Sequence, residues 1–247
     1  MITLRRSTSR SHVQQRRRET WSTFSPTASP QEPLAAFGLL VGLDELWLPG
    51  SGVETPHPRE EGEVVAYVYK GALAQEDSTG RSGVAHAGEF QHCVINRGVR
   101  YKENNASRGG RAQVYRISLL STQVGLDSVR EQRLFPAAQR RNVLCVVASP
   151  DGRRGSLRIL QDAFVISSVL DPGHHLVHEL APGRSVWLHV VDGEAVLQDI
   201  VLTAGDGAGV TGEPSVSFTA RESTEILLVD LGPMPSSFGR APTEGRA

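Results

Sequence analysis

The chain has few of the features that define several large protein classes. Its two cysteines, Cys93 and Cys145, are too few for a disulfide framework, and each lies in an apolar, strand-like segment. No apolar run approaches the roughly 18–20 residues of a membrane span. The basic amino-terminal segment also has no apolar stretch of the kind that secretory signals carry. We therefore expect a cytoplasmic protein with no membrane association, whose cysteines are small buried hydrophobic residues.

An excess of charge of either sign is also missing. The net charge is −1, which provides no general attraction to nucleic acid or to an anionic membrane surface. A basic stretch covers residues 10–18, but no aromatic residues alternate with its arginines, so a solvated loop is favoured over a nucleic-acid-binding arm. The sequence has no Ser–His–Asp arrangement, no glycine loop for phosphate and no paired-cysteine zinc motif. We expect no nucleic-acid partner.

The chain is instead rich in turn residues and short strand-like segments. It holds 25 glycines and 14 prolines, and long helical patterns are rare, which favours an all-β architecture. Residues 63–69 and 113–120 are typical of buried strands, and Asp77-Ser78-Thr79-Gly80 is typical of a turn. Short strands at regular spacing predict a sandwich or a small barrel.

An internal repeat divides the chain into two similar halves. Residues 65–77 align with residues 187–199 at a constant offset (193 − 71 = 122), and residues 87–89 align with 204–206 (205 − 88 = 117). Two tandem copies of one β-domain explain this pattern. We predict an amino-terminal strand and loop that pack on the barrels (1–33), a first domain (34–125), a polar, irregular linker (126–142), a second domain (143–232) and a tail (233–247).

The strongest candidate site lies in the first copy, on residues 55–63 and 98–103. Residues two apart on a strand point to the same face, so His57 and Arg59 share one face, as do Tyr101 and Glu103. If the two strands adjoin, these four side chains converge. Histidines in place of Arg59 and Tyr101 would complete a ligand set suited to Fe, Ni, Mn or Zn.

As it stands, this set is a poor metal site. A guanidinium has no usable lone pair and a fixed positive charge, so Arg59 cannot bind a cation. Tyr101 could bind only as phenolate, and its unperturbed pKa is about 10. We therefore expect no metal; if one binds, its ligands are His57, Tyr101 and Glu103. Arg59 is expected to pair with Glu103 and to fill the vacant space.

The other histidines are weaker candidates. On the repeat offsets, the four site positions correspond to Glu179, Ala181, Phe218 and Ala220, which form no ligand cluster, so any chemistry belongs to the first copy. We expect His86 and His92 to lie on the surface or at a strand edge. We expect His174 and His175 to lie in a turn, and His178 and Glu179 to lie on opposite faces of a strand, rather than around a second metal.

In its full pattern, the sequence resembles the pirin family of bicupins. The resemblance runs from Ile2 to about Leu231 and rests on the order and spacing of several short segments. These are residues 21–25, 57–58, 77–80, 87–91, 103–104, 149–152, 155–157 and 161–162, together with Glu63, Tyr67, Val68 and Gly71. The family implies two tandem cupin, jelly-roll-like β-barrels. It also implies a metal in the first barrel, held by a His-x-His and a His-x-Glu pair, of which His57 and Glu103 are present.

Three functions follow from the resemblance and the altered site. The first is a small phenolic or anionic ligand bound by His57, Arg59, Tyr101 and Glu103, with metal-independent acid–base chemistry in which His57, Tyr101 and Glu103 act as catalytic groups. The second is a quercetinase-type dioxygenase that uses Fe, Ni or Mn. The third is a non-catalytic regulator that acts through a protein partner. Bacterial members of the family include quercetinases, and other members act as interaction proteins.

Overall fold

The computed structural model describes residues 1–15, 18–24, 35–50, 62–95, 98–107, 109–120 and 130–234, and describes 55–57 by their backbone alone. β-Strands dominate these ranges. The helices found there are short: η1 (Ser7–Ser9), α1 (Ala137–Arg140) and η2 (Arg153–Gly155). Within the same ranges, no helix has the length and apolar character that a membrane crossing requires.

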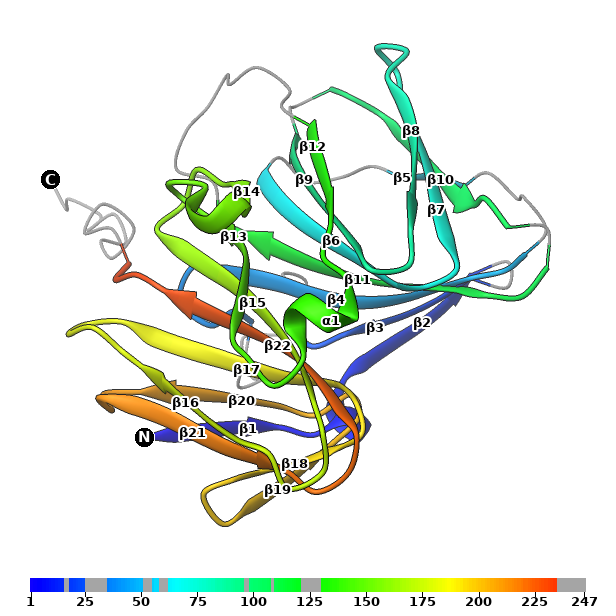
Figure 1. Ribbon diagram of the computed structural model, residues 1–247. Coiled ribbons are helices and arrows are strands. Elements are labelled where there is room, and N and C mark those ends of the chain that lie inside the picture. The colour runs from blue at the N-terminus through cyan, green and yellow to red at the C-terminus, as the bar shows by residue number, and fades with distance from the viewer. Residues whose placement is uncertain are drawn as a thin grey trace, which may run out of the picture.

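Two sheets build the first barrel, which is the upper one in Figure 1. The larger sheet has the order β12 (Arg130–Leu134), β9 (Glu89–Ile95), β6 (Gly62–Lys70), β11 (Ala112–Leu119), β4 (Leu40–Leu48), β3 (Arg18–Ser22) and β2 (Ser11–Gln15). The smaller sheet has the order β5 (Thr55–His57), β10 (Tyr101–Asn105), β7 (Ala72–Asp77) and β8 (Ser82–His86).

The second barrel has the same two-sheet construction. Its larger sheet has the order β1 (Ile2–Arg5), β20 (Gly207–Thr211), β17 (Ser185–Asp192), β22 (Thr224–Leu231), β15 (Ala163–Leu170), β13 (Cys145–Ser149) and β14 (Leu157–Arg158). Its smaller sheet has the order β16 (His175–Glu179), β21 (Ser215–Ala220), β18 (Glu194–Leu197) and β19 (Ile200–Thr203).

The predicted repeat is confirmed by strand register. Ala72 pairs with His86 in the first barrel, and Glu194 pairs with Thr203 in the second, at the two offsets of 122 and 117. The turns that open these hairpins require glycine, because Gly71 and Gly193 both have positive φ (78° and 83°). A Cβ at Gly193 would also overlap the carbonyl oxygen of Ser223. The all-β, two-barrel fold is therefore as predicted.

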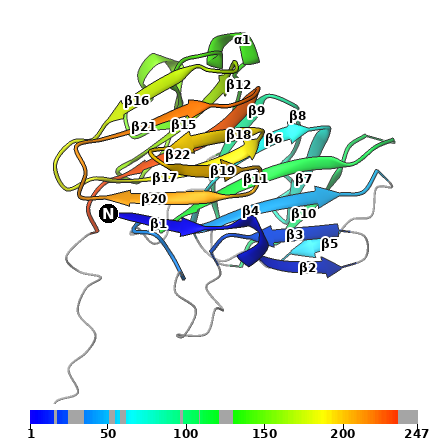
Figure 2. The ribbon, with the colours of Figure 1, turned by 90° about the horizontal axis from the view of Figure 1, so that it is seen from below.

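The amino-terminal chain joins both barrels. Strand β1 pairs with β20 of the second barrel, whereas β2 and β3 extend the first barrel beside β4. Figure 2 shows the amino-terminal segment passing from β1, beside β20, to β2 and β3, which extend the sheet beside β4. The predicted linker is not irregular in its described part, because it holds β12, which pairs with β9, and helix α1. The domain limits drawn from the sequence remain a prediction.

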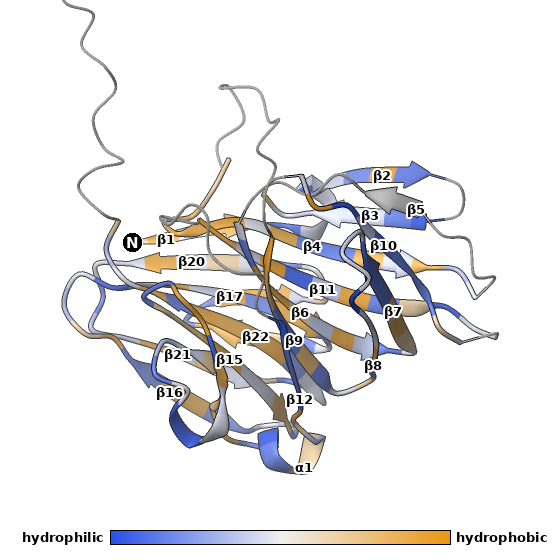
Figure 3. Ribbon diagram, turned by 90° about the horizontal axis from the view of Figure 1, so that it is seen from above, coloured by the Kyte–Doolittle hydropathy of each residue, from blue (hydrophilic) through white to orange (hydrophobic). Residues whose placement is uncertain are grey.

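A large apolar core joins the two larger sheets. Trp187 of the second barrel and Tyr67 and Phe90 of the first are fully buried in it. Tyr67 stacks on Phe90 with 4.3 Å between ring centroids, and Phe24 packs edge-on against Trp187 at 4.7 Å. Strands β22 and β15 are mostly hydrophobic in Figure 3. Cys93 and Cys145 are only half-buried, contrary to expectation, and they form no disulfide with each other.

Arg140 at the end of α1 connects the barrels through polar contacts inside this core. Its guanidinium lies 2.6 Å from Oε1 of Glu225 and donates to Oγ of Ser167 at 2.7 Å. Tyr67 of the first barrel donates to the same Glu225 at 2.5 Å. Burial raises the pKa of Tyr67, and the negative charge of Glu225 raises it further, so Tyr67 remains a neutral donor.

We predict that Arg140→Ala lowers the free energy of unfolding by about 3–5 kcal/mol, because it leaves Glu225 without its cation in a desolvated interface. The measurement is urea unfolding followed by fluorescence. The neighbouring Arg141→Ala is the matched control, since Arg141 and its partner Asp171 are exposed and such pairs contribute about 0–1 kcal/mol. Equal losses in the two variants would contradict the assigned role.

His189, the repeat equivalent of Tyr67, is a second polar residue of this interface. Its ring packs edge-on against Tyr115 at 5.7 Å, and neither ring nitrogen has a hydrogen-bond partner among the described residues. Burial lowers the pKa of His189 to about 3, and the positive charge of Arg10 adds to this effect. The folded state therefore holds His189 neutral where the unfolded chain would protonate it.

This burial predicts a pH dependence of stability. The unfolded chain takes up a proton at His189 below about pH 6.5 and the folded chain only near pH 3, so the stability present above pH 6.5 falls as the pH drops through that window. The wild type should lose roughly 1 kcal/mol per pH unit more than His189→Leu between pH 6 and pH 4. Parallel curves of unfolding free energy against pH would contradict this.

Candidate functional site

The two strands that carry the predicted site residues lie side by side. Tyr101 of β10 is directly opposite His57 of β5, and Glu103 is opposite Thr55. On its other side, β10 pairs with β7, so that Glu103 is opposite Gln75. The side chain of His57 and all of Arg59 fall outside the described residues, so their roles remain a prediction.

Tyr101 and Glu103 point into the first barrel, as their spacing predicts. Glu103 is 1% exposed and Tyr101 8%, whereas Lys102 between them is exposed. Tyr101 packs in a small apolar cluster with Val64 and Ile95. The alternation follows from the pleat of the strand, which sends successive side chains to opposite faces.

Glu103 lies at the centre of a polar network. Its Oε1 accepts a hydrogen bond of 2.7 Å from Nε2 of Gln75, and its Oε2 forms an ion pair with Arg116 of β11. Arg130 of β12 in turn donates to Oε1 of Gln75 at 3.1 Å. The two guanidinium groups and one carboxylate leave the network with a net positive charge.

The described residues of this network are not arranged as metal ligands. The Arg116 guanidinium already occupies one carboxylate oxygen of Glu103, and a cation there would meet a fixed like charge. Across the described ranges, no group of three or more His, Cys, Asp and Glu side chains is arranged to hold a metal. A metal ion at Glu103 would require Arg116 to leave its partner.

The sequence analysis did not predict that Arg116 is the cation beside Glu103. Arg59 was expected in this place, but in the described network Arg116 of β11 provides the guanidinium. A signal was available, because Arg116 is the charged residue of a mostly apolar strand and falls on the barrel-facing side with Val114. Its partner was not predictable, since Glu103 and Arg116 meet only when β10 and β11 of different sheets close the barrel.

A second acid, Asp44, lies near this network. It is directly opposite Arg116 in the pairing of β11 with β4, and cross-strand partners share a face. Burial raises the pKa of Asp44, while a hydrogen bond from Ser22 and the charges of Arg10 and Arg18 oppose that shift. Asp44 therefore keeps a proton to higher pH than an exposed aspartate does, which suits a proton donor.

The second barrel has no equivalent network, although the predicted correspondence needs correction. In the first barrel Glu103 lies opposite Gln75, and in the second barrel Phe218 lies opposite Leu197, which is the repeat equivalent of Gln75 (197 − 75 = 122). Phe218 is therefore the structural equivalent of Glu103. By the same register, Val216 is the equivalent of Tyr101, and His178, which lies opposite Val216, is the equivalent of His57. The gap between the repeats is 115 residues at this strand, not 117.

His178 is the one histidine that recurs at a site position, and it serves structure. Its Nε2 lies 2.8 Å from Oδ2 of Asp230, whose other oxygen accepts a hydrogen bond of 2.6 Å from Arg184. Thr219 contacts Nδ1 of His175 at 2.9 Å.

His174 closes the turn after Asp171 as expected, but His175 begins β16 instead of lying in that turn. His178 and Glu179 are neighbours on β16 and therefore point to opposite faces, as predicted.

His92 differs from its predicted place at a strand edge. It is fully buried, and its Nε2 lies 2.7 Å from Oε1 of Glu63. The carboxylate of Glu63 also accepts hydrogen bonds from the backbone N–H groups of Leu160 (2.6 Å) and Gln161 (3.1 Å) in the second barrel. His92 therefore supports the contact between the barrels, whereas His86 is exposed as expected.

Comparison with protein families gives two matches that follow the two barrels. The Pirin family matches residues 4–118, and the family described as "Quercetinase C-terminal cupin domain" matches residues 146–231. Among curated proteins, quercetin 2,3-dioxygenase of Escherichia coli K12 is 33% identical over 236 residues, 95% of this chain and 100% of that protein. A putative quercetin 2,3-dioxygenase of Pseudomonas aeruginosa is 30% identical over 194 residues, 78% of this chain and 83% of that protein.

Solved structures show the same architecture. The Escherichia coli bacterial pirin YhhW in complex with nickel(II) superposes with a TM-score of 0.86 at 30% identity, covering 95% of this chain and 100% of that one. Escherichia coli YhaK, at 24% identity, has a TM-score of 0.73 over 87% of this chain and 93% of its own, and it supports the fold alone.

We predict strong energetic coupling between Arg116 and Glu103. Removing one charge leaves the other buried, so Arg116→Met and Glu103→Gln should each cost about 3–5 kcal/mol of unfolding free energy. The double variant should cost clearly less than the sum, because it removes both charges. Urea unfolding of the four proteins gives the double-mutant cycle, and additive losses would contradict the ion pair.

Proposed function

Because the chain belongs to the pirin family and has its bicupin fold, we propose that its first barrel binds a small phenolic or other anionic molecule without a metal ion. The observation that carries this proposal is the Arg116–Glu103 ion pair, which puts a fixed positive charge where a metal-binding relative would hold its cation. Arg130 adds a second positive charge through Gln75. A bound anion would supply the negative charge that this network lacks.

The residues of the pocket have distinct roles in this proposal. Arg116 and, from the sequence, Arg59 attract and orient the anionic group of the ligand. His57, Tyr101 and Glu103 are the groups that can transfer protons to or from a bound ligand, and Asp44 is a further proton donor. Isomerisation or cyclisation of a phenolic ligand needs only such transfers.

We also propose that the protein is cytoplasmic.

A metal-dependent dioxygenase is the second candidate. Two observations favour it: the Escherichia coli relative is named quercetin 2,3-dioxygenase, and the bacterial pirin YhhW forms a complex with nickel(II). In this chain, the ligands of Fe, Ni or Mn would be His57, Tyr101 and Glu103, and Arg116 would first have to release Glu103.

A regulator that acts through a protein partner is the third candidate, and it requires neither a metal nor the turnover of a ligand.

Metal analysis separates the first two candidates. We predict that purified wild-type protein binds Ni²⁺ or Mn²⁺ far below one equivalent, and that Arg59→His with Tyr101→His and Arg116→Met raises binding to near one equivalent, because three imidazoles and a carboxylate then face the pocket. The measurement is elemental analysis after metal loading and dialysis. Adding Glu103→Ala to the triple variant is the control and should abolish binding.

Two outcomes would overturn the proposal. Near-stoichiometric Fe, Ni or Mn in the wild type, lost in Glu103→Ala, would favour the dioxygenase. Failure of phenolic anions such as 3,4-dihydroxybenzoate to bind the wild type would favour a regulator without a ligand. The proposal requires that this anion bind more tightly than neutral catechol and that Arg116→Met remove the preference.

A further inference from the structure

A cavity separate from the polar network around Glu103 lies where the two barrels meet the amino-terminal segment. Its volume is about 590 Å³, which is within the range of small-molecule sites. The first barrel contributes β3, β4, β6 and β11, and the second contributes the ends of β17 and the turn before β20. The residues that line it are Ser7, Thr8, Arg10, Trp21, Glu45, Trp47, Tyr69, Lys70, Arg111, Gln113, Tyr115, Val191, Asp192, Ala204 and Gly205.

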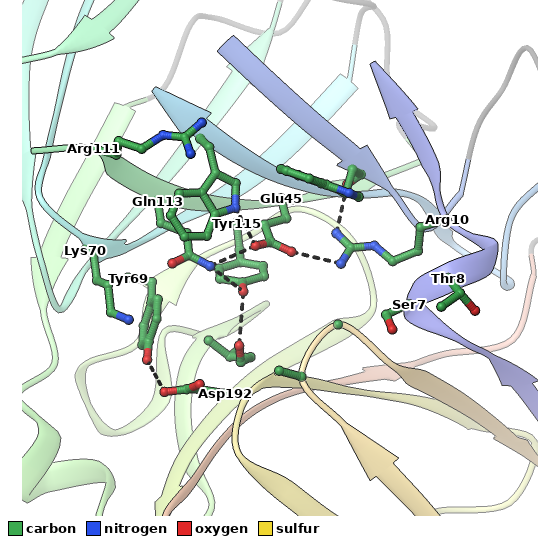
Figure 4. A pocket seen from close by; sticks show the side chains of 15 residues that line it. Ser7, Thr8, Arg10, Glu45, Tyr69, Lys70, Arg111, Gln113, Tyr115 and Asp192 are labelled. Atoms are coloured by element: carbon green, nitrogen blue, oxygen red, sulfur yellow. Dashed lines mark hydrogen bonds and ion pairs between the residues drawn. The ribbon is translucent and has the colours of Figure 1, made fainter. Parts of the chain in front are cut away.

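The acidic side chains of this cavity already have partners. Glu45 accepts hydrogen bonds from Arg10 (2.8 Å), from Nε1 of Trp47 (2.7 Å) and from Nε2 of Gln113 (2.8 Å). Asp192 accepts one from the Tyr69 hydroxyl at 2.7 Å. Figure 4 shows the hydrogen bonds that Glu45 and Asp192 accept from these neighbouring side chains. A ligand therefore meets little unbalanced negative charge.

The basic side chains retain unused donors. Lys70 lies over the ring of Tyr69, with Nζ 4.5 Å from its centroid, and makes no ion pair with any residue that the structure describes. Arg111 lies over Trp47, 5.1 Å from its centroid, and pairs with the half-buried Glu19. Nε of Arg10 is buried and lacks a hydrogen-bond partner within the described ranges. Arg10 pairs with Glu45 and Arg111 with Glu19, so in the described part of the chain Lys70 is the cation of this cavity that has no ion-pair partner.

Aromatic rings form much of the remaining wall. Trp21, Trp47, Tyr69 and Tyr115 all line the cavity. In Figure 4, Lys70, Tyr69 and Arg111 lie on one side and Ser7, Thr8 and Arg10 on the other. Burial raises the pKa of Tyr69, and its hydrogen bond to Asp192 raises it further, so that the ring stays neutral beside Lys70. Flat rings with a cation at one end match a planar aromatic anion.

We propose that this cavity is a second binding site, specific for an aromatic carboxylate. The carboxylate group binds Lys70 and Arg111, and the ring packs among the aromatic side chains. Because both barrels supply wall residues, the ligand also stabilises their contact. The site is independent of Arg116 and Glu103, which lie inside the first barrel.

The chain offers a direct test, because Lys70 and Lys102 are its two lysines. Acetylation of the intact protein by an N-hydroxysuccinimide ester, read by mass spectrometry, reports both lysines at once. Saturating 2-naphthoate should slow acetylation of Lys70 at least fivefold and leave Lys102, on the exposed face of β10, unchanged. The neutral 2-naphthamide and the non-aromatic cyclohexanecarboxylate should protect Lys70 much less.

Calorimetric titration with 2-naphthoate supplies the second measurement. Lys70→Gln should weaken binding at least tenfold, whereas the matched control Lys102→Gln should leave it unchanged. Arg116→Met should remove the preference of the first barrel for phenolic anions over neutral catechol but keep protection of Lys70, which separates this site from the proposed function. Equal protection of both lysines, or equal affinity of wild type and Lys70→Gln, would overturn the inference.

Discussion

The structure depends on burying one face of each seven-stranded sheet against the other. Trp187, Tyr67 and Phe90 are removed from water there, and burial of aromatic side chains of this size dominates the energetics of such contacts. Polar groups enter this layer only with partners or in a neutral form. Glu63 accepts two backbone N–H groups of the other barrel, Arg140 neutralises Glu225, and His189 is uncharged. The same layer fixes the orientation of both barrels and closes the cavity beside Tyr115.

The pocket of the first barrel obeys the same rule of charge compensation. A buried carboxylate such as Glu103 needs a positive partner, and in metal-binding cupins the metal ion can supply it. Here Arg116 supplies it from within the chain. A guanidinium cannot be removed by a chelator and cannot change oxidation state. The positive charge beside Glu103 is therefore permanent, which is why we propose an anionic ligand for this site.

Much of the fold could be predicted from the sequence, because alternation and repetition are local signals. The 122-residue offset between Gly71 and Gly193 located equivalent turns, and the inward direction of Tyr101 and Glu103 followed from their spacing. The partners of buried charges could not be predicted. Arg116 meets Glu103, and His92 meets Glu63, only after strands distant in sequence have paired. Strand β12 was missed because its exposed, polar residues resemble a linker.

The equivalence of the two halves extends to the surface between them. Each half contributes its larger sheet, and the central strands β6 and β17 carry Tyr67 and His189 at matching positions. In a dimer, such a self-complementary contact would be called isologous, and every substitution in it would appear twice. Here the two halves belong to one chain, so each position can change alone. Tyrosine on one side and histidine on the other illustrate that freedom, which an assembly of identical subunits does not have.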